Sequence, residues 1–286
     1  MTLQQAVVLA LQASVLLTVF GFGLRATVSE LLYLLRRPWL LARSLVAMFV
    51  VMPIIAVILV RSFELRPSFE IALIALSISP VPPLLPTKES KAGGVTAYAL
   101  GLMGVVALLA IVVVPMLVEV GERYFDRPFQ MPPAAIAKVV LTTIVVPLVA
   151  GLLVRALVPT VASRLAKPIR LVAPALLLAG AVALLASALP AMLGLADGRT
   201  LVAMTAFVSI GLAAGHWLGG PHAEEATVLA LSTANRHPAI AFALAKTNSP
   251  DEPFLGVSIL LYLVVAAVLS VPYVSRQRRN RGARPS

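Results

Sequence analysis

The chain contains no cysteine among its 286 residues. This absence excludes a disulfide framework, a zinc site built on thiolates and a cysteine nucleophile. Charged side chains are scarce as well, at 12% of the residues, whereas hydrophobic residues make up 60%. Soluble domains carry about 25% charged residues, so this is the composition of a membrane protein. Lys and Arg are also absent from residues 1–5, so we expect the first apolar segment to be retained rather than cleaved as a signal peptide.

The apolar residues fall into about nine segments, and a helix needs about 20 residues to cross the hydrocarbon core. The segments are 5–24, 39–60, 69–97, 98–118, 134–157, 169–189, 199–219, 223–247 and 253–274. Two of them, 69–97 and 223–247, are interrupted by prolines and polar residues. We therefore predict an all-α polytopic membrane protein with about nine transmembrane helices, two of which are broken.

The net charge of +11 is distributed unevenly among the connections between these segments. Basic residues are most frequent after the first segment, after the fifth, and in the tail 276–286. These three regions share one side only if the number of crossings is odd, and basic connections favour the cytoplasm. We expect an integral protein of the inner or plasma membrane with its amino terminus outside and a basic cytoplasmic tail. The positive charge then reflects topology, and no nucleic-acid partner is expected.

The polar run Asn235-Arg236-His237-Pro238 lies in the middle of segment 223–247. Neither apolar half of this segment can cross the bilayer alone, so the run is predicted near mid-membrane. A charge at that depth is unfavourable and usually marks the path of a substrate or an ion. This pattern favours a transporter.

The second interruption, in segment 69–97, begins with a run of prolines. Each proline removes a backbone donor, so such a run cannot continue a regular helix. The proposed break residues of the two segments are Pro80, Pro82, Pro83, Pro86 and Pro238. The third and eighth segments run in opposite directions, as in an inverted repeat. We expect a first repeat of four helices in 1–132 and a second of five in 133–275, with the breaks crossing at mid-membrane.

Crossed broken helices present their ends to one cavity, where positive charge attracts anions and carbonyl groups accept cations. We expect an anionic substrate to be held by Arg236 and Lys88, with polar contacts from Ser232, Thr233, Asn235 and Thr87. His237 is a candidate proton carrier, and Glu89 and Lys91 are candidates for an ion pair or for coupling. Structural roles for these residues stay open as alternatives. Lys88–Lys91 would then be a solvated loop, Arg236 a structural strut, and His237 a packing residue.

Several short motifs resemble the bile acid:sodium symporter family. They are Phe20-Gly-Phe-Gly-Leu24, Leu34-Leu-Arg-Arg-Pro38, Met52-Pro53, Pro80, Ala92-Gly-Gly94, Thr233-Ala-Asn235 and Ala239-Ile-Ala241. The resemblance covers most of the chain. It implies the family's ten-helix transporter fold, here without the first helix, with segments 1, 5 and 6 as a panel and the others as a core.

The chain departs from this family at the residues that would bind sodium. The family's sodium-binding Ser and Asn fall on Leu85 and Pro86, and its Glu and Gln fall on Ala230 and Ala234. We therefore expect that the sodium sites are lost and that Arg236 or Lys88 stands in place of the ion. No cofactor or metal is expected, although Na⁺ itself stays open.

The sequence thus predicts a secondary active transporter of a small or amphipathic organic anion that works by alternating access. One alternative is a proton-coupled or uniport carrier of the same fold, and another is a non-transporting membrane sensor or scaffold. An enzyme is not expected, because Ser232 and His237 are separated by the break and make a poor nucleophile–base pair. The expected partners are the organic anion and the lipid bilayer, and the oligomeric state stays open.

Overall fold

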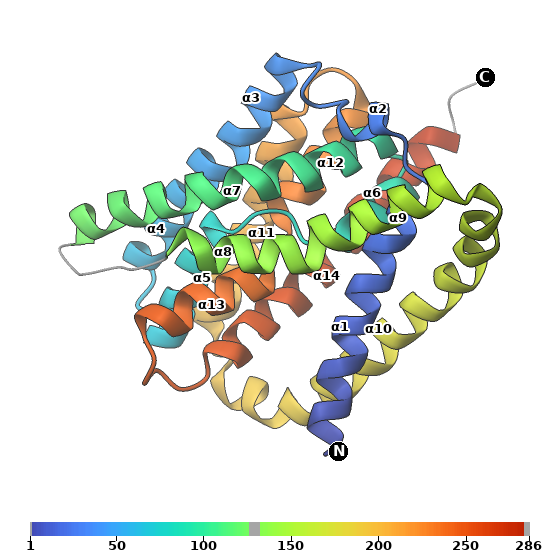
Figure 1. Ribbon diagram of the computed structural model, residues 1–286. Helices are drawn as coiled ribbons and strands as arrows, with labels where there is room; N and C mark the ends of the chain where they lie inside the picture. The colour runs from blue at the N-terminus through green and yellow to red at the C-terminus, as the bar shows by residue number, and fades with distance from the viewer. Residues whose placement is uncertain (1, 126–131, 283–286) are drawn as a thin grey trace.

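The computed structural model describes residues 2–125 and 132–282, which form helices and short connections with no strand among them (Figure 1). Seven helical segments in this described part are long and apolar enough to cross a membrane. The two interrupted segments each form a pair of shorter helices, α5 (Pro67–Ile78) with α6 (Leu85–Lys91) and α12 (Ala223–Ala234) with α13 (Pro238–Asn248). The predicted all-α polytopic membrane fold is confirmed.

The other helices mostly correspond to the predicted segments, although α10 extends beyond 169–189 at both ends and α2 lies between two segments. They are α1 (Leu3–Gly23), α2 (Val28–Leu31), α3 (Pro38–Val46), α4 (Met52–Ser62), α7 (Thr96–Phe125), α8 (Pro133–Val140), α9 (Val146–Leu157), α10 (Pro159–Leu195), α11 (Gly198–Leu218) and α14 (Leu255–Gly282). Proline occupies the first position of several of them, where its missing N–H has no intrahelical partner to lose. A capping box of Thr2 and Gln5 begins α1, and the Asp197 side chain accepts from the Thr200 N–H at 2.7 Å to begin α11.

Two segments contain a π-helical turn just before a proline. The turn Ala47–Val51 joins α3 to α4, and the turn Leu141–Val145 joins α8 to α9. In a π-helical register the residue at position 53 would donate its N–H to the carbonyl five residues earlier, that of Met48. Proline has no N–H, so this carbonyl is left without its intrahelical partner.

The helices α1, α9 and α10 pack closely on one another, and α1 and α10 run side by side in Figure 1. A Cβ atom added to Gly23 would come within 2.3 Å of the Leu148 carbonyl oxygen, and one added to Gly151 within 2.3 Å of the Phe20 oxygen. Only glycine allows α1 and α9 this approach. These helices come from segments 1, 5 and 6, the ones that the resemblance assigns to a panel.

Side-chain contacts divide the connections between helices into two groups. At one end of the molecule Arg37 pairs with Glu225, Arg155 donates to the carbonyls of Arg25 and Ala26, and Arg278 donates to that of Lys91. The second group is joined by ion pairs of Arg199 with Glu64 and of Arg66 with Asp197. The connections richest in basic residues therefore share one end. The start of α1 and the end of α14 lie at opposite ends of the molecule (Figure 1). Arg127 and residues 283–286 of the basic tail, Arg284 included, lie outside the described residues.

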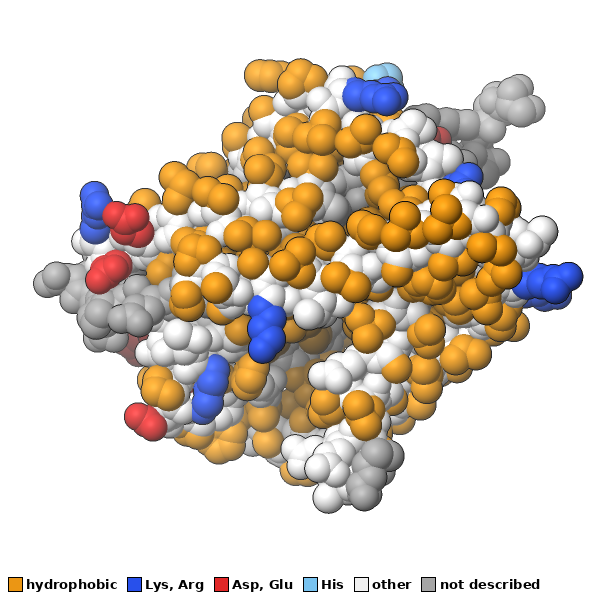
Figure 2. All heavy atoms as spheres, viewed as in Figure 1, with side chains coloured by type: hydrophobic (Ala, Val, Ile, Leu, Met, Phe, Trp, Pro, Cys, Tyr) orange, Lys and Arg blue, Asp and Glu red, His pale blue; other side chains and the backbone are white. Residues whose placement is uncertain are grey.

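Hydrophobic side chains cover much of the face shown in Figure 2. Large apolar residues such as Leu157 and Trp217 are 77% and 82% exposed. In water so much exposed apolar surface would drive aggregation, whereas in a bilayer it faces the lipid chains.

Candidate functional site

The two breaks lie against each other inside the molecule. The backbone N–H of His237, between α12 and α13, donates to the carbonyl of Pro80, between α5 and α6, at 2.9 Å. Pro80, Pro82 and Pro83 belong to the non-helical link that follows α5. Pro86 and Pro238 instead fall in the first turn of α6 and of α13, where a missing N–H is tolerated. The predicted interruptions are thus present, and they meet.

Arg236 lies in this contact with an exposed fraction of 0%. Its Nε donates to the carbonyl of Leu76 at 3.2 Å, and Nη2 donates to the carbonyls of Ser77 and Met48. Leu76 and Ser77 belong to the last turn of α5, where the Leu76 carbonyl also accepts from the Ser79 N–H at 3.1 Å. The Met48 carbonyl is the one that Pro53 leaves free. The guanidinium therefore contacts two carbonyls at the negative end of the α5 dipole and a third in the turn between α3 and α4.

Arg236 contacts backbone carbonyls rather than a carboxylate. No carboxylate of the described residues forms an ion pair with it, and its Nη1 has no hydrogen-bond partner there. The hydroxyl of Tyr262 on α14 donates to the neighbouring Ala234 carbonyl at 2.7 Å, which closes the end of α12. Arg236 and Tyr262 thus both donate to backbone carbonyls at the ends of the broken helices.

Glu89 and Ser232 form a second link between the broken segments. Glu89 of α6 is fully buried, and its Oε1 accepts from the Ser232 hydroxyl of α12 at 2.5 Å. The other oxygen, Oε2, has no partner among the described residues. No ion pair joins Glu89 to Lys88 or Lys91 in the described part of the chain. Lys91 is exposed, and its carbonyl accepts from Arg278 of α14 at 2.8 Å.

The remaining predicted residues make local contacts in this structure. The Thr233 hydroxyl donates to the Leu229 carbonyl at 2.7 Å, and the Asn235 amide donates to the Leu231 carbonyl at 2.8 Å. His237 is buried, and its Nδ1 accepts from the Ile240 N–H at 3.5 Å as the cap of α13. Thr87 and Lys88 are half-buried on α6. The break thus brings Ser232, Arg236 and His237 into contact with the other broken segment.

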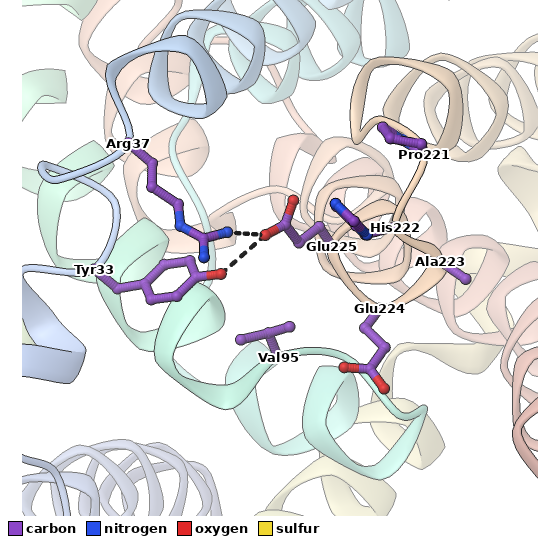
Figure 3. A pocket seen from close by; sticks show the side chains of 8 residues that line it. All are labelled: Tyr33, Arg37, Val95, Pro221, His222, Ala223, Glu224 and Glu225. Atoms are coloured by element: carbon purple, nitrogen blue, oxygen red, sulfur yellow. Dashed lines mark hydrogen bonds and ion pairs between the residues drawn. The ribbon is translucent and has the colours of Figure 1, made fainter. Parts of the chain in front are cut away.

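A cavity of about 300 Å³ lies away from this crossing, near the end that carries the basic connections (Figure 3). Its lining consists of Tyr33, Arg37, Val95, Pro221, His222, Ala223, Glu224 and Glu225. None of the predicted substrate-binding residues is among them.

Glu225 organises one wall of this cavity and is buried, with 7% exposed. It accepts from the Tyr33 hydroxyl at 2.9 Å and pairs with Arg37, whose guanidinium lies 4.4 Å from the centre of the Tyr33 ring. Burial of the phenol and its hydrogen bond to Glu225 raise the pKa of Tyr33 to about 12. The sequence does not indicate this cluster, because Tyr33 and Arg37 are distant from Glu225 in the chain.

The positions on which the resemblance places the sodium ligands are apolar. Leu85, Pro86, Ala230 and Ala234 are all buried and have no side-chain oxygen. A dehydrated Na⁺ needs several oxygen ligands, so these four side chains do not fit the ion. The carbonyls nearest to the crossing that could attract a cation already accept hydrogen bonds from Arg236.

Comparison with known proteins gives a family and one relative. The model of the Sodium Bile acid symporter family matches residues 13–194. A protein described as "Uncharacterized sodium-dependent transporter YocS", from Bacillus subtilis (strain 168), is 25% identical over 136 residues. The match covers 48% of this chain and 41% of that protein, so it spans less than half the length of either.

Proposed function

The chain belongs to the Sodium Bile acid symporter family, and from this premise we propose that it is a secondary active transporter of a small or amphipathic organic anion. Alternating access around the crossing of α5–α6 with α12–α13 carries the anion across the membrane. The helices α1, α9 and α10 serve as the panel against which the remaining core moves. Membership of a transporter family favours transport over catalysis. The amino terminus is outside, and the end with the basic connections faces the cytoplasm.

The charge near the crossing favours an anionic substrate. Arg236 is a fixed cation inside the molecule, and Lys88 on α6 adds a second positive charge. Glu89 on α6 is the acidic side chain that bonds to the other broken segment, through Ser232. Positive potential in a region of low dielectric raises the local concentration of anions. Ser232, Thr233, Asn235 and Thr87 supply the polar contacts once the crossing opens.

Arg236 takes the place of the sodium ion in this proposal. The observation that carries it is the contact of one buried guanidinium with the carbonyls of Leu76, Ser77 and Met48. In transporters with broken helices, carbonyls at the ends of half-helices are the groups that coordinate sodium. A covalently attached cation on such carbonyls stabilises the crossing without a bound ion. YocS is described as sodium-dependent, so the competing expectation is that this chain also binds sodium.

Ligand-dependent melting of the purified protein tests this function. The melting temperature is measured in detergent with taurocholate as the amphipathic anion and succinate as the small one, in NaCl and in KCl. A ligand at about 100 times its Kd stabilises by about 2.7 kcal/mol, which shifts the transition visibly. We expect the same shift in both salts. A shift confined to NaCl would show that sodium binds and would overturn the role given to Arg236.

Flux separates the transporter from a sensor or scaffold on the same fold. Uptake of the stabilising anion into proteoliposomes is measured with and without a pH gradient. Uptake supports a carrier, and its response to the gradient distinguishes a proton-coupled carrier from a uniporter. Binding without uptake would make the protein a sensor.

A further inference from the structure

Glu89 is a buried carboxyl group. Neither the contacts of Arg236 nor the apolar sodium positions account for its burial. It lies on α6 with an exposed fraction of 0%, and Ser232 of α12 donates to its Oε1. Its Oε2 is enclosed by the protein and has no hydrogen-bond partner in the described residues. A buried carboxylate oxygen without a donor is strongly unfavourable, whereas a carboxylic acid can place its own hydrogen there.

No charged or titratable group of the described residues forms an ion pair with the Glu89 carboxyl. Lys88 and Lys91 share its helix, and neither forms an ion pair with it in the described structure. On α7 the hydroxyl of Tyr98 shares a hydrogen bond of 2.8 Å with Ser44. On α12, Glu224 lines the cavity and Glu225 pairs with Arg37 there (Figure 3). Arg278 of α14 donates to the Lys91 carbonyl. No cation of the described residues forms an ion pair with the carboxyl, and the charge of Lys88 acts on it without a direct contact.

We infer that Glu89 is a proton-binding site that couples proton movement to anion transport. The carboxylate takes up one proton on Oε2 to form the neutral acid, while Oε1 continues to accept from Ser232. The proton comes from the compartment to which the crossing is open and is released on the other side. This inference rests on the proposed function for its coupling role, but protonation of Glu89 does not depend on it.

Electrostatics link the proton to the anion. An ionised Glu89 would repel an anion near Arg236, and the neutral acid removes that repulsion. Proton binding and anion binding therefore strengthen each other, and the coupling is reciprocal. Because the Glu89–Ser232 bond joins α6 to α12, loss of the proton changes a contact between the two broken segments. One monovalent anion and one proton carry no net charge together, and Arg236 stays in the core during the whole transport cycle.

His237 is a poorer proton carrier in this structure. Its Nδ1 accepts the Ile240 N–H at the start of α13, and Nε2 has no partner among the described residues. An imidazolium would lose that acceptor and place a positive charge at the positive end of the helix dipole, beside Arg236. The sequence pointed to His237 because of its usual titration range, whereas the tertiary contacts favour Glu89.

Infrared spectroscopy of the ligand-free protein tests the site directly. A protonated carboxylic acid shows a C=O stretch separate from the carboxylate bands. We expect this band in the wild-type protein at neutral pH, its loss as the pH is raised, and its absence in Glu89→Gln. Glu225→Gln is the matched control, because Glu225 is buried as well but paired with Arg37. Its removal should leave the acid band unchanged.

A second variant covers the case in which Glu89→Gln does not fold. Ser232→Ala removes the donor to Oε1, so the acid band should move to higher frequency without disappearing. A wild-type spectrum without the band, or a band that persists in Glu89→Gln, overturns the inference. Loss of the band on replacing KCl by NaCl at constant pH would mean that the carboxyl binds sodium, and this also overturns it.

Coupling is tested in proteoliposomes with whichever of taurocholate and succinate binds in the melting experiment. A pH-sensitive dye should report proton entry with anion uptake, and Glu89→Gln should abolish the dependence on the pH gradient. Gradient-driven uptake that survives Glu89→Gln overturns the coupling role. An acid band without anion binding would instead contradict the proposed function and leave the proton site standing, so the two failures are distinguishable.

Discussion

The backbone N–H of His237 donates to the carbonyl of Pro80 at 2.9 Å and thereby joins the two breaks of the chain to each other. Both groups lie outside helices, and both are buried where water cannot satisfy them. Each break supplies the partner that the other lacks. The irregular backbone is therefore stable only as a pair, which explains why two interruptions occur and why they meet.

Replacing Arg236 should destabilise the protein strongly. Arg236→Met leaves the carbonyls of Ser77 and Met48 without the donor that Arg236 supplies, and each buried acceptor left unsatisfied costs about 1–3 kcal/mol. The free energy of unfolding is obtained from denaturant titration in detergent. Arg199→Met is the control, because its exposed ion pair with Glu64 should contribute less than about 1 kcal/mol. Equal stability of the two variants would contradict the role of Arg236.

The same variant should become sensitive to sodium. With the guanidinium removed, the three carbonyls can accept a cation again, so NaCl should raise the melting temperature of Arg236→Met more than KCl does. The wild-type protein should melt alike in both salts. A wild-type preference for sodium would mean that a separate sodium site exists.

The close approach of α1 and α9 predicts a sharp difference between two glycines. Gly23→Ala brings a Cβ atom within 2.3 Å of the Leu148 carbonyl oxygen, and overpacking of this kind costs about 1–3 kcal/mol. Gly104→Ala meets nothing within 4 Å and should be neutral or slightly stabilising, since alanine favours helix. Melting temperatures of both variants check this. A neutral Gly23→Ala would show that the two helices separate more readily than the structure indicates.

The absence of cysteine makes the orientation directly testable. A single cysteine at Glu64 lies at the end that we assign to the outside, and one at Glu30 lies in the connection assigned to the cytoplasm. In intact cells a membrane-impermeant maleimide should label Glu64→Cys at once and Glu30→Cys only after permeabilisation. The reverse pattern would invert the orientation while leaving the fold unchanged.

The Tyr33–Glu225 contact predicts a loss of stability at alkaline pH. Burial and the hydrogen bond raise the pKa of Tyr33 from its ordinary 10.0 to about 12. A raised pKa of the folded state means that the contribution is full below pH 10.0 and is lost as the pH rises to about 12. The gap in melting temperature between the wild-type protein and Tyr33→Phe should therefore be constant near neutral pH and close above pH 10.0. A gap that closes at lower pH would contradict the contact.

Much of the fold follows from local chemistry. The predicted segment 199–219 became α11 and 223–247 became the pair α12 and α13, because apolar length and proline position act on the chain nearby. The proline run after Ser79 predicted the break. Only the structure shows the π-helical turns before Pro53 and Pro147, since no simple sequence pattern distinguishes a π-helical turn from an ordinary proline kink.

The sequence predicted several residues of the candidate site, but it did not predict which groups they contact. Arg236 and Ser232 were singled out as substrate contacts, yet the structure directs them to backbone carbonyls and to Glu89. Tyr262 was missed entirely, because its hydroxyl bonds to a carbonyl and carries no motif.

The sequence by itself determined the membrane class, the places where helices begin and break, and the loss of side-chain oxygens at the expected sodium positions. Each of these is a property of residues close together in the chain. The tertiary structure decided that Arg236 faces the carbonyls of Leu76, Ser77 and Met48, and that Glu89 is buried against Ser232. Every residue has a backbone carbonyl, so the sequence does not indicate which carbonyls a side chain will contact. That is decided only when distant segments of the chain pack together.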